Sequence, residues 1–239
     1  MKIPLHEVRL QVEFKRTIKV LSHLLQAEDR LRSAGFGQLL VPKEDMASET
    51  SILLQPLRYT QTDSHGKVLR VAHIGLETVE YIENSAIYKT FEAFFANFNK
   101  LLFPILKDIE PLEMWVTYMD RFDEELVDEI LWDFLREAMK TVFGDISKSM
   151  EPKETYPITG FRLPLGAEEF LEFIIRPSGA PGNSYDLRLT HVTYPEKPED
   201  IKALAYKGRK LIKQVFYNLI SKELVAAIEK HGKRGRKSK

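Results

Sequence analysis

The stretch LHEVRLQVEF, from Leu5 to Phe14, decides how the fold begins. Apolar and polar side chains alternate along it, with Val8, Leu10, Val12 and Phe14 on one side and Glu7, Arg9, Gln11 and Glu13 on the other. A period of two is typical of a strand with one buried face and one polar face. We therefore expect a half-buried strand over residues 5–14.

Four segments repeat their apolar residues every three to four positions, which predicts amphipathic helices. They are residues 17–33, 88–106, 124–143 and 199–230. Ala34–Gly37 is expected to end the first helix, and Ser85 is expected to cap the second. The second helix has a stripe of aromatic side chains, which we interpret as packing against a sheet rather than as a ligand site.

The other apolar segments are predicted strands: residues 39–41, 51–62, 67–82, 112–122, 155–165, 169–176 and 185–194. Short turns separate several of them, and Asp63-Ser64-His65-Gly66 is a strong hairpin signal. Strands that follow one another through short turns favour an antiparallel sheet. The predicted fold class is α+β, with a curved, mainly antiparallel sheet packed by long amphipathic helices.

We expect one domain over residues 1–229, with an internal boundary near residue 150. Each half ends in strands that lead into an amphipathic helix, so two similar half-domains are considered, although no residue-level repeat supports them. Residues 230–239 are expected to form a basic, disordered tail.

The charges are unevenly distributed. The chain has 35 basic and 35 acidic side chains, and six of the basic ones lie in residues 230–239. An acidic body does not suit nucleic-acid binding by the fold itself. The tail residues Lys233, Arg234, Arg236 and Lys237 are candidates for weak, nonspecific nucleic-acid contact through counterion release. A solubilising end is the other interpretation of this tail.

The composition excludes several kinds of chemistry. The chain has no cysteine, which excludes disulfides, thiolate catalysis and cysteine-ligated metals. No segment has the length and apolarity of a membrane span, and the amino terminus lacks the apolar core of a secretory signal. We therefore expect a cytoplasmic protein without membrane contact.

No catalytic motif is present. The sequence has neither a P-loop nor a nucleophile elbow, and its six histidines lack metal-ligand spacing. We assign no catalytic residue, metal or cofactor. Two acidic features keep a metal-dependent hydrolase or nuclease open: Glu13 with Lys15, and the run of acids from Asp120 to Asp133. Each also has a structural interpretation, as a solvated strand end and as carboxylates at a helix amino terminus capped by Asp123.

A helix that crosses a curved sheet can leave an apolar groove, by analogy with helix-grip folds. Tyr118, Asp120, Arg121 and His191 are the candidate polar contacts in such a groove. Asp120 and Arg121 are chosen because they are expected at a strand exit, where functional residues often lie.

Several segments together resemble a sporadically distributed bacterial family of uncharacterised proteins of about 250 residues. They are the opening strand over 5–14, the hairpin at 63–66 leading into 68–72, Tyr88 with Phe91, Glu92 and Phe94, the strand end over 117–122, and 215–223. Asp120 stands where the family pattern has Asn, and Tyr206-Lys207 where it has a His. The resemblance implies architecture but no established activity.

Three functions follow as hypotheses. The first is a non-enzymatic binding or interaction protein, the partner of a neighbouring defence or toxin–antitoxin component, which the patchy distribution of the family suggests. The second is a small-molecule binder that uses the groove between sheet and helix. The third is the metal-dependent hydrolase or nuclease.

Overall fold

The computed structural model describes residues 5–37, 56–123, 159–166, 168–177 and 184–219, and every structural statement below concerns these residues. They form eight strands: β1 (Leu5–Phe14), β2 (Leu57–Thr62), β3 (Val68–Ile74), β4 (Thr78–Asn84), β5 (Pro111–Asp123), β6 (Thr159–Gly166), β7 (Glu169–Pro177) and β8 (Ser184–Thr193). The helices are α1 (Lys19–Ser33), α3 (Phe91–Leu101), α4 (Phe103–Leu106) and α7 (Asp200–Leu219).

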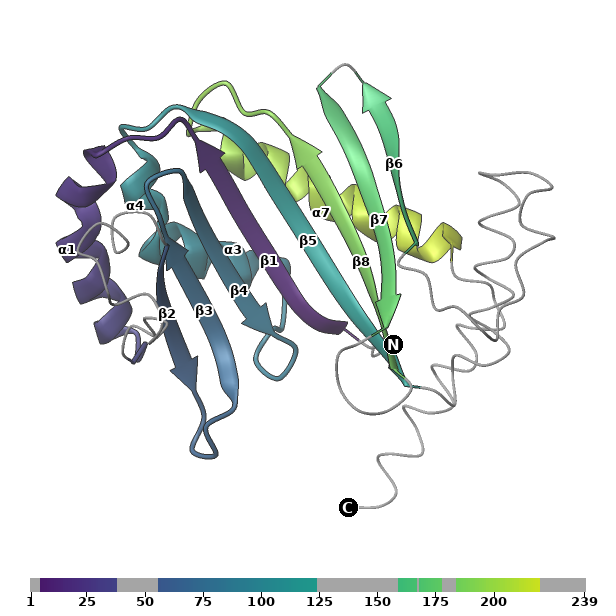
Figure 1. Ribbon diagram of the computed structural model, residues 1–239, viewed down its shortest axis with the longest axis horizontal. Helices are drawn as coiled ribbons and strands as arrows, with labels where there is room; N and C mark the ends of the chain where they lie inside the picture. The colour runs from purple at the N-terminus through teal and green to yellow at the C-terminus, as the bar shows by residue number, and fades with distance from the viewer. Residues whose placement is uncertain (1–4, 38–55, 124–158, 167, 178–183, 220–239) are drawn as a thin grey trace, which may run out of the picture.

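All eight strands belong to one open sheet with the order β2-β3-β4-β1-β5-β8-β7-β6 (Figure 1). Every neighbouring pair is antiparallel. The predicted α+β class with an antiparallel sheet is therefore confirmed. β1 and β5 form the centre of the sheet, and β2 and β6 are its edges.

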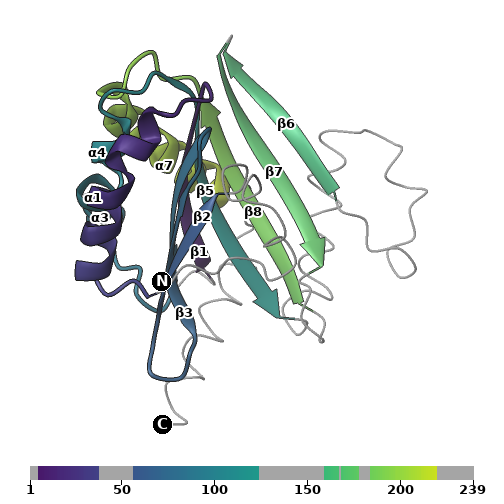
Figure 2. The same cartoon turned by 60° about the vertical axis from the view of Figure 1, so that its left-hand side comes forward.

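The helices lie on one face of the sheet (Figure 2). The hydrophobic core lies between them and the sheet, and every helix contributes to it. Val8, Leu10, Val12 and Phe14 of β1 face this core and are at most 2% exposed. The alternation that predicted the first strand thus assigns its two faces correctly.

The opposite face of the sheet carries ion pairs between neighbouring strands. Arg9 of β1 contacts Glu80 of β4 at 3.0 Å, and Arg188 of β8 contacts Glu172 of β7 at 2.8 Å. Arg9 is opposite Ile82 and Arg188 is opposite Ile174, so each arginine contacts a glutamate two residues along the neighbouring strand, on the same face of the sheet.

Two predicted elements are divided in the structure. Residues 67–82 form β3 and β4 rather than one strand, with a tight turn in which the Gly75 amide donates to the Thr78 carbonyl at 2.8 Å. The helix expected over 88–106 begins at Phe91 and is interrupted before α4. Pro104 explains the interruption, since proline has no amide hydrogen for the helix interior.

The helix boundaries follow capping chemistry. Thr90, not Ser85, caps α3: its Oγ1 accepts a hydrogen bond from the Ala93 amide at 3.2 Å. The predicted stop after α1 is confirmed, and Gly35 supplies it with a φ of +84°, which favours glycine.

The predicted hairpin over residues 63–66 is also confirmed. Asp63 Oδ1 accepts hydrogen bonds from the amides of His65 and Lys67, each at 2.9 Å. Gly66 has a φ of +78°. An aspartate that satisfies turn amides and a glycine at positive φ are the features expected of such a turn.

Several predictions lie outside the described residues. They are the strand over 39–41, the helix over 124–143, the ends of the segments 51–62, 155–165 and 199–230, the boundary near residue 150, and the tail over 230–239. Within the described residues, no helix combines the length and apolarity needed to cross a membrane.

Candidate functional site

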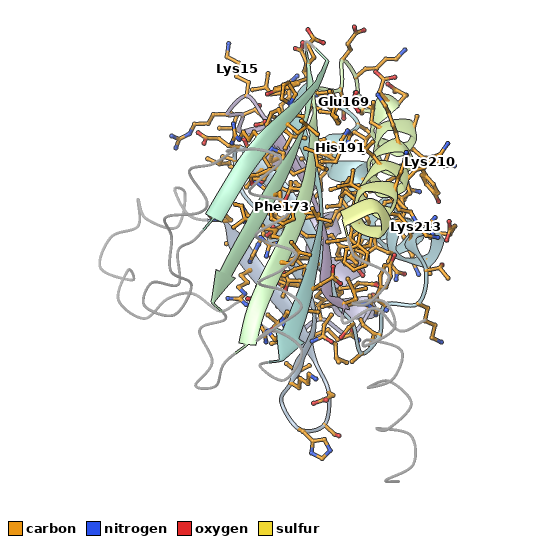
Figure 3. All side chains as sticks on the ribbon, turned by 90° about the vertical axis from the view of Figure 1, so that its right-hand side faces the viewer. Lys15, Glu169, Phe173, His191, Lys210 and Lys213 are labelled. Atoms are coloured by element: carbon orange, nitrogen blue, oxygen red, sulfur yellow. The ribbon has the colours of Figure 1, made fainter. Side chains whose placement is uncertain are left out.

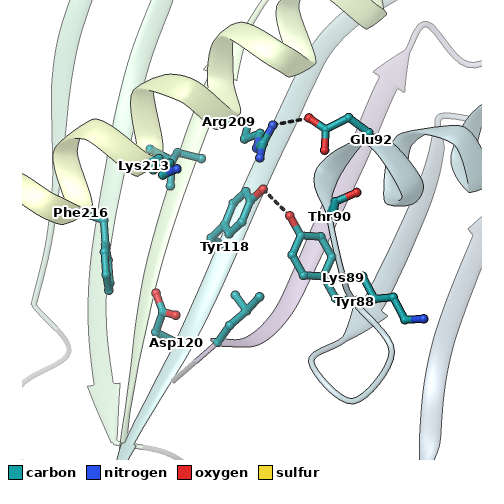
Figure 4. A pocket seen from close by; sticks show the side chains of 11 residues that line it. Tyr88, Lys89, Thr90, Glu92, Tyr118, Asp120, Arg209, Lys213 and Phe216 are labelled. Atoms are coloured by element: carbon teal, nitrogen blue, oxygen red, sulfur yellow. Dashed lines mark hydrogen bonds and ion pairs between the residues drawn. The ribbon is translucent and has the colours of Figure 1, made fainter. Parts of the chain in front are cut away.

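A pocket of about 270 Å³ opens between the centre of the sheet and the helices that cover it. We call it the Asp120 pocket. Its walls are Leu5, Tyr88, Lys89, Thr90, Glu92, Tyr118, Asp120, Arg209, Ile212, Lys213 and Phe216 (Figure 4). They come from β1, β5, α3, α7 and the segment that leads into α3, so the pocket depends on the assembled fold.

Strand and helix periodicity explain why these side chains converge. Tyr118 and Asp120 are two residues apart on β5 and therefore point to the same face of the sheet. Arg209, Ile212 and Phe216 are spaced by three and four residues on α7, so they share the side of the helix that faces this part of the sheet.

Asp120 is the most unusual residue of the pocket. It is 2% exposed, and its Oδ1 finds no hydrogen-bond partner among the residues that the structure describes. On the sheet its neighbours are the apolar Leu5 and Leu187. Burial disfavours the charged carboxylate and raises the pKa of Asp120 to about 7. At neutral pH a substantial share of this carboxyl group is therefore protonated.

A pair of tyrosine side chains lines the pocket together with Asp120. Tyr88 Oη and Tyr118 Oη are 3.0 Å apart, and the Tyr118 ring stacks near Phe91 with its centroid 6.5 Å away. Burial raises the pKa of both tyrosines, so both hydroxyl groups stay protonated. They can offer hydrogen bonds, but they are poorly suited to accept a proton as a base.

The far end of the pocket is charged. Arg209 Nη1 contacts Glu92 Oε1 at 2.5 Å, and the Arg209 guanidinium lies 5.5 Å from the centre of the Phe91 ring. A hydrogen bond from its own backbone amide lowers the pKa of Glu92, which keeps it ionised. Lys89 and Lys213 add two more basic side chains to the lining. The pocket lining thus includes basic side chains beside the Arg209–Glu92 ion pair.

The structure places two of the four predicted ligand contacts, Tyr118 and Asp120, in this pocket. Arg121 points to the opposite face of the sheet, where its Nε donates to Asp186 Oδ1 at 2.8 Å. His191 is fully buried under α7 and does not line the pocket. The four residues thus divide between the pocket and two other environments. Lys233, Arg234, Arg236 and Lys237 lie outside the described residues.

His191 belongs to a polar cluster that holds α7 on the sheet (Figure 3). Its Nε2 lies 2.6 Å from Glu169 Oε1, and Lys207 of α7 donates to Glu169 Oε2 at 2.7 Å. Burial lowers the pKa of His191, so the neutral ring is favoured. This cluster positions the helix that supplies Arg209 and Phe216 to the pocket.

Of the described residues that suggested metal chemistry, Asp120 lines this pocket, whereas Glu13 and Lys15 do not. Glu13 is on the opposite face of β1, where its Oε1 accepts a hydrogen bond from Gln11, and Lys15 lines a shallow depression near the start of α1. Among the described residues, no three acidic or histidine side chains are grouped to hold a metal ion. The acids from 124 to 133 lie outside the described residues, and the side chain of Asp123 is not described.

Sequence reasoning missed the residues that α7 and the α3 cap contribute. The sequence pattern indicates only an amphipathic helix for the segment that contains Arg209, Ile212 and Phe216. Ser85 rather than Thr90 was predicted to be the cap of α3. A signal that could have found Arg209 is its position, because a basic residue there borders the apolar face of the helix.

Comparison with known proteins adds no relative. No protein-family model, no curated protein and no solved structure matches the chain.

Proposed function

We propose that this chain is a binding protein for a small molecule, which it takes up in the Asp120 pocket. One observation carries the proposal: the buried Asp120 carboxyl group has an oxygen without a hydrogen-bond partner among the described residues and lines an open pocket. An unpaired buried polar group costs about 1–3 kcal/mol. A ligand that hydrogen-bonds to Asp120 would recover that free energy on binding.

The surroundings of Asp120 support a binding role over catalysis. Tyr88 and Tyr118 are kept protonated by burial, and Arg209 is paired with Glu92. Of the three hypotheses from the sequence, the small-molecule binder is the one that this geometry favours. The partner in a neighbouring locus and the metal-dependent hydrolase have no comparable observation behind them.

The test is a fragment screen by protein-observed NMR, with a library of aromatic acids, amides and amines. We expect fragments that shift the signals of Tyr118, Asp120 and Ile212 in the wild-type protein. Ile212→Trp is designed to fill the pocket from α7 and should abolish those shifts. If no fragment shifts these signals, or if the shifts persist in Ile212→Trp, the proposal is wrong.

We also propose that the chain consists of two similar half-domains. The support is the strand order, in which β2-β3-β4-β1 is followed by β5-β8-β7-β6, the same arrangement read in the reverse direction. In this proposal the boundary falls between Leu106 and Pro111, well before residue 150. The Asp120 pocket then lies where the halves meet, a common place for ligand sites.

A further inference from the structure

We propose that the ligand of the Asp120 pocket is a planar lactam that carries an anionic group, such as a pyrimidine carboxylate or a pyrimidine nucleotide. The lactam edge pairs with Asp120, and the anion lies at the Arg209 end. This inference rests on the proposed function, because it assigns a ligand class to the same pocket.

The inner end of the pocket selects the lactam. A protonated carboxyl group has one donor and one acceptor side by side in one plane. The N–H and C=O of a lactam have the same spacing with the complementary order, so the two groups can form a pair of hydrogen bonds. That pairing would satisfy the Asp120 Oδ1 atom, which has no partner among the described residues.

An amine is the main alternative partner for Asp120, and the surroundings disfavour it. An ammonium–carboxylate pair here would place two charges between Leu5 and Leu187, where Asp120 is 2% exposed. Desolvating two charges often costs more than their attraction returns. A neutral pair of hydrogen bonds avoids that cost.

The walls between the two ends suit a planar ring. Leu5 and Ile212 are apolar, and Tyr88, Tyr118 and Phe216 contribute aromatic rings. Aromatic side chains pack favourably against flat π systems. Because the pocket is about 270 Å³, near the lower end of ligand-site volumes, it fits one ring with substituents better than a large cofactor.

The outer end selects the anion. Arg209 and Asp120 lie at opposite ends of the pocket, with Tyr118 between them (Figure 4). Arg209, which pairs there with Glu92, supplies positive charge at this end, and Lys89 adds a basic side chain to the pocket lining. The amino terminus of α3, capped by Thr90, borders the same end, and a helix amino terminus favours negative charge.

The experiment is a calorimetric titration of the full chain at pH 6 with five probes: orotate, uridine 5′-monophosphate, uracil, benzoate and benzylamine. Orotate or uridine 5′-monophosphate should bind at least about tenfold more tightly than uracil, which lacks the anion, and benzoate, which lacks the lactam. If orotate binds more tightly than uridine 5′-monophosphate, the ligand is a pyrimidine carboxylate. If uridine 5′-monophosphate binds more tightly, the ligand is a pyrimidine nucleotide.

Variants separate the two ends. Arg209→Gln should weaken the anionic lactams about tenfold and leave uracil unchanged. Asp120→Leu should abolish binding of uracil and orotate alike. Asp120→Asn keeps a donor and an acceptor, so it should retain binding. This second variant keeps the proposal testable if the Asp120→Leu protein does not fold.

A pH series adds a readout that simple pocket filling would not change. Because burial raises the pKa of Asp120 to about 7, wild-type affinity for orotate should fall about tenfold from pH 6 to pH 8. Asp120→Asn should show no such fall.

The other titratable and charged side chains at the pocket are Tyr88, Tyr118, Lys89, Glu92, Arg209 and Lys213. All of them are present in Asp120→Asn, so the comparison isolates the contribution of Asp120. His6, next to Leu5 on β1, interacts with Arg121 and Asp186, and His6→Gln should keep the wild-type profile.

Three results would overturn the ligand class: benzylamine binding more tightly than both anionic lactams, benzoate matching orotate, or none of the probes binding. Each of them leaves the proposed function standing if the fragment screen still finds ligands that Ile212→Trp excludes. Failure of that screen is the separate result that removes the pocket itself as a binding site.

Discussion

Gly208 of α7 lies directly against His191 of β8. A Cβ atom added at position 208 would stand 2.5 Å from His191 Nδ1 and 3.1 Å from its Cγ. Real side chains do not approach so closely, so glycine at this position sets how near α7 can come to the sheet. The same helix supplies Arg209, Ile212 and Phe216 to the Asp120 pocket.

We expect Gly208→Ala to destabilise the protein although alanine is the better helix former. The clash should cost about 1–3 kcal/mol, whereas the gain in helix propensity is at most about 1 kcal/mol. Urea denaturation would measure the change in the free energy of unfolding.

The control for this prediction is the double variant His191→Ala/Gly208→Ala. Removing the imidazole ring makes room for the new methyl group, so Gly208→Ala should then be neutral or stabilising. Additive effects of the two substitutions would mean that the contact between them is not the cause.

The features of the fold that were predictable are the local ones. Three features depend only on residues close together in the sequence and were predicted from short segments: the alternation of β1, the Asp63–Gly66 turn and the stop after α1 at Gly35. The split of 67–82 at Gly75 was missed because a lone glycine also occurs inside strands. Thr90 was missed as a cap because Ser85 has the same chemistry five residues earlier.

The candidate site was predictable only in part, because its residues come from distant segments. Asp120 and Arg121 were chosen for their place at a strand exit, and Tyr118 was chosen as a polar contact in the expected groove. Because successive side chains of a strand point to opposite faces, Arg121 lies on the other face of the sheet from Asp120. Choosing residues by their closeness in the sequence does not distinguish the two faces. His191 illustrates a second difficulty: its burial under α7 depends on Gly208, which lies 17 positions later in the sequence.

Asp120→Asn should stabilise the protein at neutral and higher pH. The folded pKa of Asp120, about 7, is above the ordinary value of 3.8, so the folded state favours the protonated form. The stability that Asp120 contributes is complete below pH 4 and is lost as the pH rises to 7. Since Asn does not titrate, the variant should gain roughly 2–4 kcal/mol over wild type at pH 8 and little at pH 4.

Asp186→Asn is the matched control for that measurement. Asp186 is buried to a similar degree at 4% exposure, but it is paired with Arg121 at 2.8 Å. Removing its charge should therefore destabilise the protein at pH 8. If both variants changed stability in the same direction, the difference between a paired and an unpaired buried carboxylate would not explain the result.

The Tyr88–Tyr118 hydroxyl pair should behave as a coupled unit. Tyr118→Phe removes one partner of the 3.0 Å hydrogen bond and leaves the half-buried Tyr88 hydroxyl without it, at a cost of about 1 kcal/mol. Tyr88→Phe/Tyr118→Phe removes both hydroxyl groups and should cost less than the two single changes added together. Thermal and urea unfolding of the four proteins would measure the coupling, and a coupling of zero would contradict the prediction.

Glu83 offers a last test, at a buried carboxylate that accepts several hydrogen bonds. Its Oε1 accepts hydrogen bonds from Tyr81 at 2.8 Å, Asn97 at 2.9 Å and Arg70 at 3.2 Å, and the residue is 2% exposed. Glu83→Gln removes the negative charge of the carboxylate that pairs with Arg70. It should therefore destabilise the protein by about 2 kcal/mol, the free energy of a hydrogen bond to a charged group. Glu77→Gln changes an exposed glutamate and should alter the free energy of unfolding by less than about 0.5 kcal/mol. Equal effects of the two substitutions in urea denaturation would show that burial and partners are not what makes Glu83 important.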